Sequence, residues 1–291
     1  MKPKLFLHGV TLAFGGLTVI DSLDIQVMPG SRTGLIGPNG AGKTTVFNLI
    51  SGVYRPNAGE ILLDDEAIDA VPLDRRVRLG IGRTFQNLRM MKHLTVLENI
   101  MLGQHTHVGL WQRMLVPLNS PFNRAGLTET RAAAQLMGLS AHADLLADGL
   151  PYGVQKRIEI ARALVTRPRL LLLDEPAAGL NSSERDELLS ILLTQLPKEM
   201  SVLIVEHDVA FVSSLCDHVV ALNFGRKIAE GRAEAVCSHP AVIEAYLGKD
   251  DDAADADAGV PAPALDETIV PQESDQKSER APGAERGTHA A

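Results

Sequence analysis

Short apolar runs alternate with stretches of helical periodicity along most of this chain. An apolar run at residues 33–36 is followed by a glycine-rich turn, and residues 44–51 then carry their large apolar side chains on one helical face. Strand-like and helix-like stretches that alternate in this way are typical of α/β proteins. We therefore predict an α/β fold.

Two further runs, 170–173 and 202–205, consist only of large apolar residues, as do strands that are buried on both faces of a sheet. The first run ends at Asp174, and the second ends at Glu206 and His207. Open α/β sheets place their functional sites at the carboxyl ends of their strands. We therefore expect these polar residues to lie at a site.

The section from about 90 to 150 differs, because it is rich in Leu, Met and Ala at helical spacing. We interpret it as a helical insertion. The sequence shows no internal repeat and no coiled-coil heptads. It also lacks the run of about 18–20 apolar residues that a membrane-spanning helix needs.

Acidic residues are concentrated near the end of the chain. Residues 249–291 contain 11 acidic and 4 basic residues, whereas the preceding 248 contain 25 and 24. Few large apolar residues are present there to offset the ordering cost of about 1–2 kcal/mol per residue, so we predict a disordered tail. The remainder is nearly neutral, which gives no case for nucleic-acid binding. Two cysteines exclude a disulfide scaffold.

Residues 37–44 read Gly-Pro-Asn-Gly-Ala-Gly-Lys-Thr and match the phosphate-binding pattern G-x-x-x-x-G-K-[ST]. Glycines allow backbone N–H groups to surround phosphate oxygens, and the following helix N-terminus attracts negative charge. Lys43 would reach the β- and γ-phosphates, and Thr44 would offer its hydroxyl to Mg²⁺. The predicted nucleotide ligands here are Gly37, Pro38, Asn39, Gly40, Ala41, Gly42, Lys43, Thr44 and Thr45.

Two adjacent carboxylates further restrict the reactions that this site could carry out. Asp174 follows a buried strand downstream of the phosphate loop, where an acidic residue suits a metal shell. Glu175 beside it could orient and deprotonate an attacking water. The alternative is that one of the two only caps the turn before Pro176.

Three more motifs follow in order. Residues 83–87 read RTFQN and contain Gln86, residues 150–155 read LPYGVQ and open an amphipathic helix, and His207 ends a strand 32 positions after Glu175. Together with the phosphate loop and the carboxylate pair, this order resembles the nucleotide-binding subunit of ABC transporters over residues 4–248. In that family these motifs are the Q-loop, the signature and the H-switch.

The resemblance implies a P-loop NTPase fold with a RecA-like core, an N-terminal antiparallel β subdomain and a helical subdomain at about 90–165. It also implies ATP and Mg²⁺ as cofactors, and two subunits that close head to tail around them. The assigned residues are Phe14 for adenine stacking, Tyr152 and Gly153 for the opposite subunit's γ-phosphate, Thr44, Gln86 and Asp174 for Mg²⁺, and Glu175, Gln86 and His207 for catalysis.

The signature departs from the family's L-S-G-G-Q. Pro151, Tyr152 and Val154 stand where the family has Ser, the first Gly and Gln. Proline suits a first helical turn, where its missing N–H is harmless. Gly153 and the helix N-terminus keep the backbone donors that a phosphate needs.

Several longer runs resemble the ATP-binding components of branched-chain amino acid uptake systems, among them 14–17, 94–99 and 242–248. This implies an ATP-hydrolysing importer subunit on the cytoplasmic face of a bacterial inner membrane. Its partners would be membrane permeases, a second ATP-binding subunit and, indirectly, a periplasmic solute-binding protein. The alternatives are a subunit for urea, amide or aromatic-acid uptake, and a soluble non-transport ABC ATPase, which the single cassette and the absence of heptads disfavour.

Overall fold

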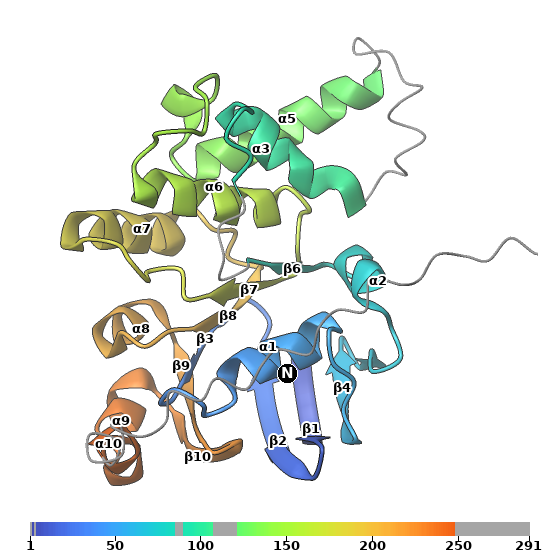
Figure 1. Cartoon of the computed structure of the whole chain (residues 1–291), viewed down its shortest axis with the longest axis vertical. Helices are drawn as coiled ribbons and strands as arrows, with labels where there is room; N and C mark the ends of the chain where they lie inside the picture. Colours follow the sequence, from blue (N-terminus) through green and yellow to red (C-terminus); the bar gives the residue numbers. More distant parts are fainter. Residues whose placement is uncertain (1, 3, 85–89, 107–120, 248–291) are drawn as a thin grey trace, which may run out of the picture. The chain divides into compact units, whose positions relative to one another are not determined.

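The fold contains two β-sheets and a group of helices (Figure 1). The computed structural model describes residues 2, 4–84, 90–106 and 121–247. The predicted tail at 249–291 and the predicted metal ligand and catalytic residue Gln86 lie outside the described residues.

The larger sheet has six strands, of which all but one run parallel to their neighbours. In spatial order they are β10 (Arg226–Gly231), β9 (His218–Asn223), β3 (Arg32–Ile36), β8 (Ser201–Val205), β7 (Leu170–Asp174) and β6 (Ile81–Arg83). Every residue of β7 and β8 is buried. The prediction of two strands covered on both faces is therefore confirmed.

The smaller sheet is antiparallel and comes mainly from the N-terminal part of the chain. Its strands in spatial order are β2 (Leu17–Val27), β1 (Leu5–Phe14), β4 (Ala58–Leu63) and β5 (Glu66–Ala67). Its buried face packs against α1 (Lys43–Ser51) and against one face of the larger sheet. Alternate residues of β7 show this division, because Leu170 and Leu172 join this core while Leu171 and Leu173 join the core on the opposite face.

The core on that opposite face includes the helices of the section predicted to be a helical insertion. Here α3 (Val96–Met101), α5 (Pro121–Leu136) and α6 (Tyr152–Leu164) pack on one another. The helix α3 begins with a capping box, in which the Thr95 and Glu98 side chains each bond to the other's backbone N–H. Among the described residues, no helix is long and apolar enough to cross a membrane.

Further helices lie between or after the strands in chain order. They are α2 (Leu73–Arg78), α7 (Ser182–Thr194), α8 (Val209–Leu215), α9 (Ala233–Cys237) and α10 (Pro240–Leu247), with short 3₁₀ turns at Leu102–Thr106 and Ser140–His142. The helix α7 begins with a second capping box, formed by Asn181 and Glu184. The last helix, α10, packs on β10 and α9.

Candidate functional site

The glycine-rich loop of residues 37–42 connects β3 to α1. Gly42 is the N-cap of α1 and has a φ of 101°, and a Cβ atom there would lie 2.7 Å from the Ile20 side chain. Glycine adopts this positive φ without strain and has no Cβ atom to collide with Ile20. Such a turn into a helix N-terminus presents the backbone N–H groups that bind phosphate. Within this segment Asn39, Gly40 and Thr44 are exposed, Thr45 is half-buried, and Pro38 and Ala41 are buried.

The Lys43 side chain is buried within the same loop. Its Nζ atom donates hydrogen bonds to the carbonyl oxygens of Gly37, at 2.7 Å, and Pro38, at 3.0 Å. The turn between β9 and β10 supports the loop from the other side, because the Gly225 N–H donates to the Ala41 carbonyl oxygen at 3.0 Å. The loop is therefore held in shape by hydrogen bonds of this chain itself.

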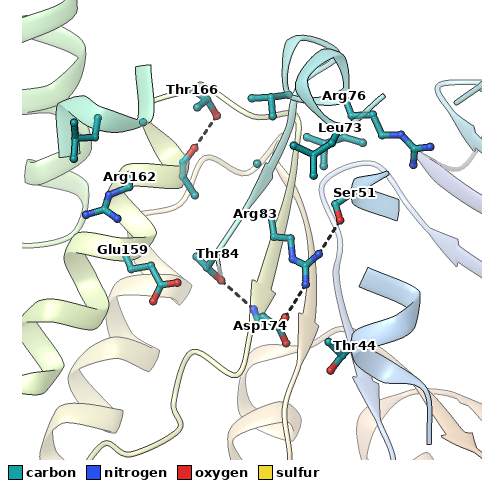
Figure 2. Close-up of a pocket in the computed structure, with 16 residues that line it drawn as sticks. Thr44, Ser51, Leu73, Arg76, Arg83, Thr84, Glu159, Arg162, Thr166 and Asp174 are labelled. Atoms are coloured by element: carbon teal, nitrogen blue, oxygen red, sulfur yellow. Dashed lines mark hydrogen bonds and ion pairs between the residues drawn. The ribbon is translucent and has the colours of Figure 1, made fainter. Parts of the chain in front are cut away.

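Asp174 ends β7, and its side chain is 1% exposed. Its Oδ2 atom accepts a hydrogen bond from Arg83 Nη2 at 3.1 Å. Figure 2 shows the Arg83 guanidinium between Asp174 and α1, where it donates to Ser51 Oγ at 2.7 Å and to Asn48 Oδ1 at 2.8 Å. Burial raises the pKa of Asp174, and the ion pair with Arg83 opposes that rise. Our sequence reasoning missed Arg83, although it directly precedes the TFQN run.

The other carboxylate oxygen of Asp174, Oδ1, is buried and has no hydrogen-bond partner in the described part of the chain. Asp174 and Thr44 line the same cavity of about 650 Å³, together with Arg83 and residues of α2 and α6 (Figure 2). Carboxylate and hydroxyl oxygens are the ligands that Mg²⁺ prefers. Of the three residues predicted to bind Mg²⁺, Thr44 and Asp174 thus line the same cavity, and Gln86 lies outside the described residues.

The fold brings Glu175 and His207 together. Glu175 has a φ of 48°, and its N–H donates to the Val205 carbonyl oxygen at 2.9 Å, which turns this residue toward β8. His207 Nε2 lies 2.8 Å from Glu175 Oε1. Left-handed backbone at a non-glycine residue costs on the order of 1 kcal/mol and is common at functional sites. A carboxylate held by an imidazole in this way can accept a proton from water.

A second buried acid, Glu206, lies beside His207. Its side chain accepts the Ala177 N–H at 2.6 Å and the His207 N–H at 3.1 Å. Burial raises the pKa of Glu206, and these two backbone donors oppose that rise. Glu206 thus joins the segment after Glu175 to the segment that carries His207. The signal in the sequence was an acid at the end of a fully apolar strand, but we assigned it no role.

The signature segment leads into α6, whose first residue is Tyr152, so Pro151 is the N-cap and not part of the first turn as predicted. The Gly153 N–H donates to Glu184 Oε1 at 3.1 Å. A Cβ atom on Gly153 would lie 2.9 Å from that oxygen. The same carboxylate completes the capping box of α7 through the Asn181 N–H. The N-terminus of α6 therefore binds a carboxylate of its own chain, which the sequence did not predict.

An exposed aromatic residue lies at the end of strand β1 in the smaller sheet. Phe14 is the last residue of β1 and is 43% exposed. Its ring contacts the Tyr54 ring edge-on, with centroids 5.1 Å apart. The exposed ring offers an apolar surface of the kind that stacks on a planar heterocycle.

Two family models match this chain. The model described as "ABC transporter" covers residues 20–178, which include the phosphate loop and the carboxylate pair. The model described as "Branched-chain amino acid ATP-binding cassette transporter" covers residues 226–252, which include β10 and α10.

Individual relatives agree with these models. The chain is 42% identical to the high-affinity branched-chain amino acid transport ATP-binding protein BraF of Pseudomonas aeruginosa, over 85% of this chain and 99% of that protein. It is 41% identical to LivG of Escherichia coli, with the same coverage. The ADP conformation of the ATP-binding cassette MJ1267 of an ABC transporter superposes with a TM-score of 0.73 at 30% identity, over 85% of this chain and 100% of that one. The predicted fold and family are thus confirmed, and the chain belongs to the ABC transporter family as an ATP-binding subunit.

Proposed function

We propose that this chain hydrolyses ATP to power the uptake of branched-chain or other hydrophobic amino acids by an ABC importer. The solute assignment is supported by BraF and LivG, which are similar over 85% of the chain, and by the match at residues 226–252. The observation that carries hydrolysis is the 2.8 Å contact between Glu175, which follows β7, and His207, which follows the neighbouring strand β8. Strand β8 also lies next to β3, the strand that leads into the phosphate loop.

ATP would contact the smaller sheet at Phe14 and the larger sheet at the phosphate loop. Phe14 would stack on the adenine, and the backbone N–H groups of residues 39–45 would surround the phosphates. Lys43 would then exchange its two carbonyl acceptors for oxygens of the β- and γ-phosphates. The exchange is favourable because a negatively charged phosphate oxygen attracts the ammonium group more strongly than a neutral carbonyl oxygen does.

Thr44, Asp174 and Gln86 would hold Mg²⁺. Asp174 Oδ1 is buried and has no hydrogen-bond partner among the described residues, which fits this role because a buried carboxylate oxygen without a partner costs free energy. Arg83 would keep the carboxylate oriented through Oδ2. When bound, Mg²⁺ would neutralise charge on the phosphate oxygens.

Hydrolysis would be carried by Glu175 and His207. Glu175 would accept a proton from the water that attacks the γ-phosphorus, giving ADP and phosphate. His207 would hold the carboxylate through Oε1 and contact the γ-phosphate. Positioning and charge stabilisation supply most of the catalysis in reactions of this kind.

A second ATP-binding subunit would complete each site. Tyr152 and Gly153 of one subunit would face the γ-phosphate held by the other, and that phosphate would replace the Glu184 carboxylate at the Gly153 N–H. The pair would bind to permeases at the cytoplasmic face of the inner membrane and would receive the solute indirectly from a periplasmic binding protein.

Uptake measurements test this function. A strain that lacks the gene should lose ATP-dependent uptake of leucine, isoleucine and valine, and the wild-type gene should restore it. The gene that carries Glu175→Gln should not restore this uptake. Unchanged amino acid uptake with loss of urea or amide uptake would contradict the proposed solute but not the ATPase role.

A further inference from the structure

The C-terminal helix α10 contacts the phosphate loop through one hydroxyl. The Gly37 N–H donates a hydrogen bond to Tyr246 Oη at 2.9 Å, although the two residues are 209 positions apart. Gly37 is buried, so its N–H is shielded from water. Burial raises the pKa of Tyr246, so the phenol, which is neutral near pH 7 at its ordinary pKa, stays neutral here.

Gly37 is held on its other sides as well. Its φ is 150°, and a Cβ atom there would lie 2.3 Å from the Leu222 carbonyl oxygen of β9. Its own carbonyl oxygen accepts Lys43 Nζ at 2.7 Å. One peptide segment thus connects the Tyr246 hydroxyl to the ammonium group that would bind the phosphates of ATP.

We propose that Tyr246 is a positioning residue for ATP binding. Its hydroxyl fixes the first residue of the phosphate loop and, through the Gly37 carbonyl, the resting position of Lys43. It acts through Gly37 and does not touch the nucleotide. This inference rests on the proposed role of the loop and of Lys43 in phosphate binding.

The placement of α10 explains why the hydroxyl is available. The helix packs on β10 and α9, its residue Val242 is 3% exposed, and the Tyr246 ring packs against the core formed on the helical side of the larger sheet. The ring therefore contributes to packing, whereas the hydrogen bond that the hydroxyl makes within the described part of the chain goes to the loop. The whole of α10 lies within residues 226–252, so the segment that matches the branched-chain amino acid model reaches the ATP site directly.

The two contributions of Tyr246 can be separated by Tyr246→Phe, which keeps the ring and removes the hydroxyl. The buried Gly37 N–H then lacks its acceptor, and the loop must be ordered by the incoming nucleotide. We expect the dissociation constant for ATP to rise about two- to tenfold, the worth of one hydrogen bond. Amide hydrogen exchange in the phosphate loop of the nucleotide-free chain should become faster.

Ser238→Ala is the matched control. It removes a hydroxyl that donates to the carbonyl oxygens of Glu234 and Ala235, in the same C-terminal segment but away from the loop. It should leave both ATP affinity and loop exchange unchanged.

The measurements use the full chain, titrated with a fluorescent ATP analogue and followed by hydrogen-exchange mass spectrometry. Wild-type affinity and wild-type loop exchange in Tyr246→Phe would overturn the inference, while ATP binding by the wild type would still support the loop's role. A wild type that fails to bind ATP would overturn both. An equal loss of affinity in Ser238→Ala would show a general effect of the C-terminal segment and would also overturn the inference.

Discussion

The helices α1 and α6 both begin with glycine-bearing turns that present backbone donors, but the two N-termini are held differently. The loop before α1 is shaped by left-handed glycines, by the hydrogen bond that Gly37 donates to Tyr246 and by the one that Gly225 donates to Ala41, and it contains the ammonium group of Lys43. The first turn of α6 instead binds a negative group, because the Gly153 N–H donates to the Glu184 carboxylate.

This difference indicates different tasks for the two termini. The loop before α1 contains the ammonium group of Lys43, which a bound phosphate would contact. The N-terminus of α6 already has an anionic partner, and a phosphate must displace a carboxylate to reach it. Binding of ATP within one chain and closure of two chains should therefore respond to different substitutions.

The largest expected effect comes from Glu175→Gln, which removes the proposed proton acceptor beside the α1 loop. A general base contributes about 10²–10⁴-fold, so turnover should fall by that factor while ATP binding persists and the closed dimer accumulates. ATPase assays on the reconstituted transporter measure this. The control is Glu66→Gln, a change at an exposed acid on β5, which should keep full turnover. Near-normal turnover in Glu175→Gln would remove Glu175 from this role.

The next substitution, Gly153→Asp, acts only on the N-terminus of α6. It places a carboxylate where a phosphate should bind, and unit charges about 4 Å apart repel by about 1 kcal/mol in water and about 4 kcal/mol at an effective dielectric constant near 20. We expect ATP-driven dimer closure to be lost and ATP binding by the isolated subunit to persist. Light scattering in the presence of ATP measures dimer closure, and nucleotide titration of the isolated subunit measures ATP binding.

The structure adds a second source of repulsion to that variant, since a Cβ atom at Gly153 would lie 2.9 Å from Glu184 Oε1. The double variant Gly153→Asp with Glu184→Gln removes the charge repulsion within the chain, leaves the close contact of the side chains, and keeps the repulsion toward the phosphate. It should still fail to close. Full dimerisation and activity of the double variant would show that this segment does not contact the opposite subunit's phosphate.

Glu184→Gln alone tests the displacement directly. Glutamine can keep the capping box of α7 but offers Gly153 a neutral acceptor, which competes less well with phosphate. ATP-driven dimerisation should tighten by about two- to tenfold, equivalent to one hydrogen bond. The matched control, Glu98→Gln, makes the same change in the capping box of α3, where the Glu98 carboxylate bonds to Thr95. Weaker dimerisation in Glu184→Gln alone would instead make Glu184 a support of the closed state.

The smallest effect is expected from Pro151→Ser. Serine is favoured at an N-cap and would add a hydroxyl worth about 0.5–1.5 kcal/mol as one hydrogen bond. Turnover should stay the same or rise slightly. A severalfold loss of turnover would show that the rigid proline is needed to start α6.

Much of this protein follows from local patterns in the sequence. The turn at Gly42 needs glycine because of its own backbone angle, and the fully apolar runs of β7 and β8 require burial on both sides. The strand ends then place Asp174, Glu175 and His207 at one edge of the sheet, because β7 and β8 are parallel neighbours. Periodicity and local backbone conformation depend only on residues that are close together in the sequence. The features named here are determined at that range.

The tertiary structure decided which distant groups meet. Arg83 binds Asp174, Tyr246 binds Gly37, and Glu184 binds Gly153, across 91, 209 and 31 positions of sequence. No periodicity indicates these pairs, because each depends on where whole helices and strands pack and on which buried polar atom then lacks water. Burial selects the partner in each case, since a buried donor or acceptor must be satisfied by whatever group the fold brings within hydrogen-bond distance.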